Sequence, residues 1–457
     1  MKKNIIGLFV LFAAMQVVGQ SGQKPDMVDY FTNNGLSGAV KTVQHPSGEY
    51  YKGVTYVAYQ GPTEDPYVAA YNHKTAKWTG PFKAGESLLT GKPGKKMFDD
   101  HGKPAMIIDD EGYIHLVFGG HGGTQDLGKN TLGNYGRGKM IHVVTKKPMD
   151  ISEWEELDNI SPFGTYNQLV KMDNGDIYLC YRHGAHRSNL VYQLSTDNGR
   201  TFAPPVSILK TKQTTGTEEN PDIQDSWYAW FDNGQGNDIS VIYDYHVCKE
   251  PNHDTERHNC YYMVLDTDKN EWRNVEGEIL SVPVTKELAD EKTLVVDTDT
   301  HWAKRGAVRL DKKAYPHIIF YQGEKAGKYM VNKQVIYYRW TGKKWMTAES
   351  PELPIATGDI IVSSPKKATL LLAGKINDTP ELAWWNTKDG GNSFKKGEVL
   401  YKGEKGGIGT SALIRNAHPD ARVIIYGNHK GYFRKMYLVG DHGPIKRLKT
   451  EADQLDE

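Results

Sequence analysis

Two stretches of similar design decide the fold: PAMIIDDEGYIHLVF at residues 104–118 and YNQLVKMDNGDIYLCY at residues 166–181. In each stretch an apolar run enters a tight turn, at residues 109–112 in the first and 173–175 in the second, and a second apolar run returns. Short runs joined by turns rich in Asp, Asn and Gly are typical of antiparallel β-hairpins. We therefore expect two consecutive hairpins of one kind.

The hairpin pattern occurs seven times along the chain. The paired runs are 54–59 with 67–71, 104–108 with 113–118, 166–172 with 177–181, 226–231 with 239–245, 307–310 with 317–321, 368–373 with 381–385, and 411–414 with 422–426. Each interval leaves room for two more strands, for example at 190–195 and 335–340. Repeats of four strands predict an all-β protein, a seven-bladed β-propeller, with residues 21–36 as a lead-in segment.

A turn motif supports this prediction. Residues 195–202, STDNGRTF, fit the Asp-box pattern S-x-D-x-G-x-T-F, and residues 387–394, TKDGGNSF, are a looser copy. Asp197 is expected to cap the turn through backbone N–H groups, while the glycine takes a positive φ. In sialidase-like propellers this box joins the outer two strands of a blade. It therefore indicates the fold and says little about the reaction.

Composition and the N-terminal sequence narrow the possible classes of protein. Lys+Arg and Asp+Glu both number 56 in 457 residues, so a generally basic surface for nucleic acid is absent. A basic start and an apolar run to Val18 predict a signal peptide over residues 1–19. We expect residues 20–457 to form one catalytic propeller domain, secreted or periplasmic, monomeric and without a membrane span.

Four polar residues lie at matching places in two neighbouring hairpins. His101 precedes one first strand and His121 ends its partner, while Tyr166 opens the next first strand and Arg182 ends its partner. Because a first strand begins where its antiparallel partner ends, all four side chains are expected to meet at one edge of the ring. Two imidazoles, a phenol and a guanidinium suit proton transfer beside an anion.

This set resembles the catalytic residues of the propeller-type ulvan lyases, polysaccharide lyase families 24 and 25, and family 25 most. The resemblance rests on the spacing of His101, His121, Tyr166 and Arg182 within an Asp-box (BNR) repeat protein, and it covers nearly the whole mature chain. It implies a secreted endolytic lyase whose partner is an acidic sulfated polysaccharide, ulvan. Such an enzyme cleaves by β-elimination at a 4-linked uronic acid and releases unsaturated oligosaccharides.

The residue chemistry agrees with a lyase. Arg182 could neutralise the uronate carboxylate and so stabilise the intermediate formed when the C5 proton leaves. Tyr166, with its phenolate favoured by Arg182, could act as base and then acid, or as acid alone with His101 as base. His121 would orient Tyr166 or the carboxylate. Lys304 and Arg305 precede the fifth first strand at the same edge and could bind sulfate or carboxylate groups, and no organic cofactor is needed.

A second constellation suggests a metal. His246, Cys248, His258 and Cys260 form two His-x-Cys pairs on expected neighbouring strands and could surround a structural zinc, with His253 as a substitute ligand. A Cys248–Cys260 disulfide, or neither arrangement, remains an alternative. The family resemblance also implies a structural metal near the active-site face.

Two other functions stay open at this point. A sialidase-like glycoside hydrolase could use the same fold, although its arginine triad and Tyr/Glu pair find no matching set. A non-catalytic sugar-binding propeller would not need the His/Tyr/Arg set. Fold alone does not decide among them.

Overall fold

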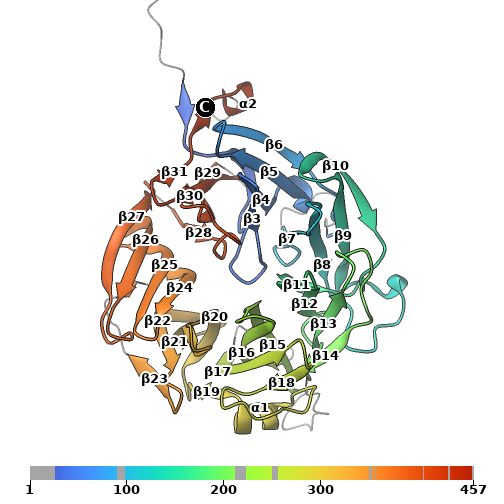
Figure 1. Cartoon of the computed structure of the whole chain (residues 1–457), viewed down its shortest axis with the longest axis vertical. Coiled ribbons are helices and arrows are strands. Elements are labelled where there is room, and N and C mark those ends of the chain that lie inside the picture. The colour runs from blue at the N-terminus through green and yellow to red at the C-terminus, as the bar shows by residue number, and fades with distance from the viewer. Residues whose placement is uncertain are drawn as a thin grey trace, which may run out of the picture.

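Seven antiparallel sheets stand around a central channel in the computed structural model (Figure 1). The structure describes residues 26–89, 98–211, 223–249, 256–348, 353–354, 356–404, 406–430 and 433–454. In each sheet the strands run from the channel outward in chain order, apart from the last sheet. The expected all-β, seven-bladed propeller is confirmed.

The first four blades follow the chain. Blade one holds β3 (Gly48–Tyr51), β4 (Val54–Gln60), β5 (Pro66–Asn72) and β6 (Lys77–Lys83). Blade two holds β7 (Ala105–Ile108), β8 (Ile114–His121), β9 (Arg137–Lys147) and β10 (Asp150–Leu157). Blade three holds β11 (Thr165–Lys171), β12 (Ile177–Arg182), β13 (Leu190–Ser195) and β14 (Val206–Leu209). Blade four holds β15 (Ile223–Asn233), β16 (Asp238–Lys249), β17 (Arg257–Asp266) and β18 (Glu271–Arg273), with β19 (Leu294–Val296) beside β17.

The remaining blades close the ring. Blade five holds β20 (Trp302–Leu310), β21 (Pro316–Ala326), β22 (Tyr329–Trp340) and β23 (Trp345–Ala348). Blade six holds β24 (Ala356–Ser364), β25 (Lys367–Ile376), β26 (Thr379–Thr387) and β27 (Lys395–Lys402). Blade seven holds β28 (Gly409–Thr410), β29 (Val423–Lys430), β30 (Phe433–Gly440) and, outermost, β2 (Thr32–Leu36), with β31 (Gly443–Pro444) beside β30. Elsewhere lie β1 (Met27–Val28) with β32 (Arg447–Leu448), the helices α1 (Lys286–Lys292) and α2 (Glu451–Gln454), and the 3-10 turns η1 (Pro62–Glu64) and η2 (Gln125–Leu127).

Two predicted hairpins are displaced by one strand. The runs at 54–59 and 67–71 are β4 and β5, and those at 368–373 and 381–385 are β25 and β26, the second and third strands of their blades. The true inner strands are β3, which is short, and β24, which contains Gly358 and the buried Asp359. Apolar residues alternate only weakly in these two strands, so the sequence pattern did not indicate them. Strands that line the channel need no continuous apolar face.

The expected lead-in segment is instead part of the propeller. β2 pairs with β30, so a strand from the start of the chain completes the last blade. This pairing covers the outer edge of β30, which would otherwise present unpaired backbone groups. The ring is therefore closed by joining the two ends of the chain.

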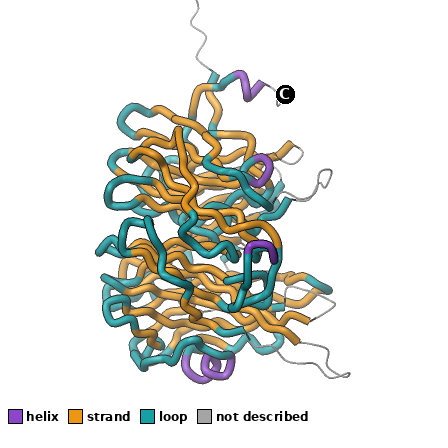
Figure 2. The backbone as a smooth tube through the Cα atoms, turned by 90° about the vertical axis from the view of Figure 1, so that its right-hand side faces the viewer, coloured by secondary structure: helices purple, strands orange, loops and turns teal. Residues whose placement is uncertain are grey.

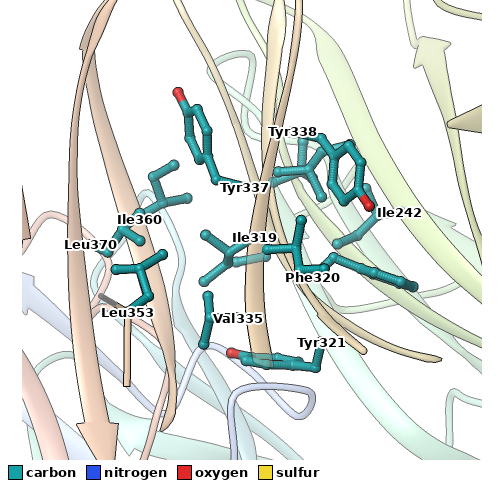
Figure 3. Close-up of a cluster of buried hydrophobic side chains, with 14 of the residues drawn as sticks. Ile242, Ile319, Phe320, Tyr321, Val335, Tyr337, Tyr338, Leu353, Ile360 and Leu370 are labelled. Atoms are coloured by element: carbon teal, nitrogen blue, oxygen red, sulfur yellow. The ribbon is translucent and has the colours of Figure 1, made fainter. Parts of the chain in front are cut away.

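The apolar core lies between neighbouring blades. Successive residues of one strand serve opposite neighbours, because side chains alternate across a sheet. In blade five Ile319 lies toward Ile360 and Leu370 of blade six, whereas Phe320 lies toward Ile242 of blade four (Figure 3). Each fully buried residue of this size contributes about 1.5–3 kcal/mol. The seven blades thus hold one another in position around the channel.

Seen from the side, the strands cross between two loop-bearing faces (Figure 2). We call the face at which the inner strands begin the site face. Among the described residues, no helix is long and apolar enough to cross a membrane. Both Asp boxes lie where expected, between β13 and β14 and between β26 and β27, and Asp197 accepts hydrogen bonds from the Thr201 N–H and hydroxyl at 2.9 and 2.6 Å.

Candidate active site

The four predicted catalytic residues meet at the site face. His101 lies in the loop before β7 and His121 ends β8, while Tyr166 lies near the start of β11 and Arg182 ends β12. The ring centroids of His101 and His121 are 3.8 Å apart, those of His101 and Tyr166 are 5.3 Å apart, and Arg182 Cζ lies 5.1 Å from the Tyr166 ring. The hairpin geometry of blades two and three therefore brings all four together.

One carboxylate orients both imidazoles. His101 Nδ1 lies 2.7 Å from Asp99 Oδ1, and His121 Nδ1 lies 2.7 Å from Asp99 Oδ2. Burial works to raise the pKa of Asp99, but the hydrogen bonds from His101 and His121 outweigh it and hold that pKa well below its usual range. An ionised Asp99 accepts from both Nδ1–H groups, which leaves each Nε2 with a free lone pair.

Asp99 is itself held from several sides. Gln60 donates to the Asp99 carbonyl at 2.9 Å, and Glu64 accepts from its backbone N–H. Arg137 Nε lies 2.6 Å from Asp99 Oδ2. Burial lowers the pKa of His101 to about 4, with the nearby His121 acting in the same direction and Asp99 opposing it. His101 is therefore a neutral imidazole across the physiological range.

Tyr166 is a neutral phenol in this setting. Burial raises its pKa, with Tyr228 adding to the effect, although Arg182, Arg257 and Arg305 oppose it. Arg182 favours the phenolate, as expected, but desolvation of the phenolate exceeds the attraction of the cations, so the net pKa of Tyr166 is raised. The backbone of Tyr166 has a φ of 59°, a strained value for an aromatic residue that is often found at functional sites.

Three guanidinium groups surround a second tyrosine. The Cζ atoms of Arg257, Arg305 and Arg182 lie 3.8, 4.8 and 5.1 Å from the ring centroid of Tyr228, whose own ring is 5.3 Å from that of Tyr166. Burial alone would raise the pKa of Tyr228, but Arg257 and Arg182 outweigh it and the pKa is lowered. The cluster therefore creates a strongly positive environment behind the two phenols.

Part of this positive charge is not neutralised. Asp244 Oδ1 lies 3.8 Å from Arg257 Nε and Asp244 Oδ2 lies 3.5 Å from Arg305 Nη1. Within the described residues, Arg182 Nε and Nη2 and Arg305 Nε find no hydrogen-bond acceptor. Arg182 exposes none of its surface and donates from Nη1 to Ser226 at 3.3 Å. A direct pair between Arg182 and a substrate carboxylate would therefore require the side chains that cover Arg182 to move.

Lys304 and Arg305 play different parts in the structure. They are neighbours on β20, so their side chains leave opposite faces of the strand. Arg305 points into the guanidinium cluster around Tyr228 and is 5% exposed. Lys304 is exposed to solvent on the site face. Desolvation by the surrounding protein lowers the pKa of Lys304 to about 7, and the nearby Arg257 and Arg305 act in the same direction.

Three of the four expected zinc ligands, His246, His258 and Cys260, have side chains in the described part of the structure. In the pairing of β16 with β17, His246 lies opposite Arg257 and His258 lies opposite Tyr245, so the two imidazoles leave opposite faces of the sheet. His246 Nδ1 lies 2.6 Å from the Glu256 carbonyl, and Cys260 is a free thiol buried in the core. The side chain of Cys248 and all of His253 lie outside the described residues.

Two other groups in the described part of the chain have the composition of metal ligands. Asp99, His101 and His121 form one, and His73, His418 and Asp420 form the other, with one ligand atom per residue within 4.8 Å of the others. In the first group Asp99 already accepts from both imidazoles. The arrangement therefore suits two oriented imidazoles, which is an acid–base function of the residues themselves.

Sequence reasoning missed several members of this site. Asp99 stands two residues before His101, an Asp-x-His pattern that could have drawn attention to it. Tyr228 and Arg257 come from blade four and have no local signal, because their relation to Tyr166 depends on how blades three and four pack. Arg137 comes from β9 and also has no local signal.

The comparisons with known proteins agree with this geometry. A model of the BNR repeat-containing family matches residues 54–352. An ulvan lyase of Nonlabens ulvanivorans is 49% identical over 97% of this chain and 96% of its own length, and one of Pseudoalteromonas sp. (strain PLSV), named Ulvan Lyase-PL25, is 48% identical over 93% and 89%. A solved PL25 ulvan lyase structure bound to -[GlcA(1-4)Rha3S]- has a TM-score of 0.90 and 46% identity, and covers 94% of this chain and 99% of that one. The chain therefore belongs to the BNR repeat-containing family and to the ulvan lyases of polysaccharide lyase family 25, and it is a polysaccharide lyase.

Proposed function

We propose that the chain is a secreted, endolytic lyase that cleaves ulvan by β-elimination at its 4-linked uronic acid. The relatives named ulvan lyase and the related structure with a bound uronate-containing oligosaccharide support the choice of substrate. The predicted signal peptide at residues 1–19, which lies outside the described residues, supports export. Membership of a lyase family argues against the hydrolase and the non-catalytic sugar-binding propeller as alternatives.

One observation carries the proposed chemistry: the Asp99 carboxylate accepts hydrogen bonds from the imidazoles of His101 and His121, next to the neutral phenol of Tyr166. His101 Nε2 takes the C5 proton of the uronate, and the electron pair of that C–H bond forms the C4=C5 double bond. The C4–O4 bond breaks, and the departing oxygen receives the Tyr166 phenolic proton. The cluster of Arg182, Arg257 and Arg305 stabilises the negative charge that develops on the carboxylate.

Three further residues, His121, Tyr228 and Lys304, support this reaction. His121 shares Asp99 with His101 and stacks on it at an interplanar angle of 12°, so it fixes the orientation of the base. Tyr228 packs beside Tyr166 and holds Arg257 and Arg305 over its ring, so that their positive charge lies close to the site. Lys304, exposed beside Arg305, is the cation best placed to contact substrate directly.

The test is an assay of ulvan cleavage by absorbance at about 235 nm, where the new conjugated double bond absorbs. Tyr166→Phe should reduce turnover by at least about a hundredfold, a typical contribution of one general acid, and leave polysaccharide binding nearly unchanged. Tyr113→Phe, in the turn between β7 and β8 at the opposite face, is the matched control and should be fully active.

Near-normal elimination by Tyr166→Phe would remove Tyr166 from the mechanism. Size analysis of early products tests the endolytic mode, since internal cleavage yields oligosaccharides of many lengths from the start. Recovery of a chain without residues 1–19 from the periplasm or medium tests export.

A further inference from the structure

A cluster of side chains with metal-binding groups lies on the face opposite the candidate active site, where the ring closes. His73 follows β5 of blade one, while His418 and Asp420 lie in the loop between β28 and β29 of blade seven. These two blades are neighbours in the ring (Figure 1). One ligand atom from each of the three residues lies within 4.8 Å of the others. The proposed lyase reaction uses none of them.

The three groups lie against one another across the boundary between the blades. The ring centroids of His73 and His418 are 4.0 Å apart. His418 Nδ1 accepts a hydrogen bond from the Asp420 backbone N–H at 3.2 Å and lies 3.6 Å from Asp420 Oδ2. Two ligands with bonds of about 2.0–2.1 Å to a tetrahedral zinc ion are about 3.4 Å apart. The imidazole and the carboxylate are therefore close to the spacing that zinc requires, and the ion would replace the long hydrogen bond.

Surrounding side chains hold the His73 ring in place. The hydroxyl oxygen of the buried Thr55 lies 2.8 Å from His73 Nε2. The rings of Tyr71 and Tyr50 lie 5.0 and 5.5 Å from the His73 ring and are nearly perpendicular to it. When Nε2–H donates to Thr55, Nδ1 is the ring nitrogen with a free lone pair. Histidines that bind metals are oriented in the same way, by a hydrogen bond from the other ring nitrogen.

The loop that carries His418 is fastened to blade one. Glu49 of β3 forms a parallel bridge with Arg415, and Arg415 Nη1 lies 2.8 Å from Glu49 Oε1. The Tyr50 backbone N–H donates to the Arg415 carbonyl at 2.9 Å. These contacts fix the loop relative to His73, so little conformational freedom is lost when a ligand binds.

We propose that His73, His418 and Asp420 bind a zinc ion that joins the first and last blades. Imidazole and carboxylate donors suit Zn²⁺, and three protein ligands leave one position for water or a fourth ligand. His442, exposed in the turn between β30 and β31, has its Nε2 3.8 Å from Asp420 Oδ1 and is the side chain placed to take that position. The three ligands are only half-buried, so the ion exchanges with the medium.

The ion acts on the closure of the ring and not on cleavage. His73 and His418 belong to opposite ends of the chain, so they meet only in the folded propeller. A ligand that binds only the folded state stabilises it by mass action. Added zinc should therefore raise the melting temperature of the unmodified chain by a few degrees, and should not raise that of His73→Ala.

The test is calorimetric titration of the purified chain, without a histidine tag or chelator, with zinc chloride. We expect one zinc per chain beyond any metal that the protein already holds, and His73→Ala and His418→Ala should each abolish this binding step. Thr55→Val keeps the shape of its strand but removes the hydroxyl, and it should weaken binding roughly tenfold. His301→Ala, at an exposed histidine before β20, is the control and should bind zinc normally.

Titration with cobalt(II) distinguishes this site from the cysteine-containing zinc set predicted from the sequence. An ion held by histidines and an aspartate gives weak visible bands, whereas a thiolate ligand adds an intense near-ultraviolet charge-transfer band. Near-UV circular dichroism checks the folding of each variant without reference to the lyase reaction, and the graded loss in Thr55→Val tests the site in a protein with all three ligands intact.

Three results would overturn the proposal. They are the absence of an additional bound metal, an additional metal that folded His73→Ala and His418→Ala retain, and a thiolate band from the added cobalt. Ulvan cleavage followed at about 235 nm should be the same in all of these variants and in the unmodified chain, because the site lies on the opposite face.

Discussion

At the scale of single residues, the carboxylate of Asp99 fixes the orientation of both histidines in the candidate active site. Because it accepts from both His101 and His121, neither imidazole can rotate freely, and each keeps the Nδ1–H tautomer. The acid and base roles follow from opposite effects of burial. Burial keeps the His101 imidazole neutral and the Tyr166 phenol protonated, since it disfavours the charged form of each.

The pH dependence of cleavage tests the assignment of His101 as base. The imidazole must be neutral to accept a proton, and its pKa lies at about 4 instead of 6.5. Activity should therefore persist as pH falls below 6.5 and be lost only as pH passes through about 4. The measurement is kcat/KM against pH, with near-UV circular dichroism as the control for folding. An acidic limb near 6.5 would assign the base to another group.

At the scale of elements, each blade places its site residues through the antiparallel pairing of its inner two strands. Thr165 pairs with Arg182, so the start of β11 and the end of β12 share the site face. The Asp box works at the outer strands and away from this face: Ser195, Asp197 and Thr201 satisfy one another within the turn. The two kinds of motif therefore act at different ends of the blade.

Removal of β2 tests how the ring is closed. A chain that lacks residues 20–36 loses the buried side chains of Phe31 and Leu36 and uncovers the edge of β30. Burial of each such side chain contributes about 1.5–3 kcal/mol, so unfolding should require several kcal/mol less. Thermal melting followed by circular dichroism measures the change. A chain that lacks only residues 20–25 is the control, and equal melting temperatures for the two would contradict this role of β2.

At the scale of the whole molecule, the packing of blades creates the charged centre of the site. Arg182 of blade three, Arg257 of blade four and Arg305 of blade five converge on Tyr228 although they lie far apart in the chain. Asp244 is the carboxylate placed against Arg257 and Arg305. A positive centre that is only partly compensated favours the developing charge of a carboxylate substrate.

The structural zinc concerns the stability of the whole molecule, and it stays a prediction. We expect about one zinc per chain by elemental analysis, lost in Cys248→Ser, and removal should lower stability by on the order of a few kcal/mol. Cys180→Ser, at a buried cysteine outside the expected set, is the control and should keep the metal. A protein free of zinc as purified would refute the prediction.

If zinc is present, the pairing of β16 with β17 implies that His258 cannot join His246 without a local change in register. The variant His258→Ala then separates two ligand sets. Retained zinc would favour His253 as the fourth ligand, and lost zinc would favour the set expected from the sequence.

The sequence by itself determined the repeated architecture, because alternation of apolar residues and turn chemistry are local properties. The turns at 109–112 and 173–175 specify their hairpins, and the Asp box at 195–202 specifies the outer turn of a blade. The same local logic placed His101 with His121 and Tyr166 with Arg182. It failed for β3 and β24, where short or polar inner strands carry little periodic signal.

Only the tertiary structure decided how those residues can act. Tyr228 with its guanidinium groups and the complete burial of Arg182 depend on contacts between blades. Asp99 accepts hydrogen bonds from two histidines of its own blade, but Gln60 and Glu64 of blade one hold it in place. The direction of the Tyr166 pKa was decided there too, because the attraction of nearby cations competes with desolvation and only the packed environment sets the balance. Residue types and spacing can name the participants of a reaction, but burial decides which of them carry a proton.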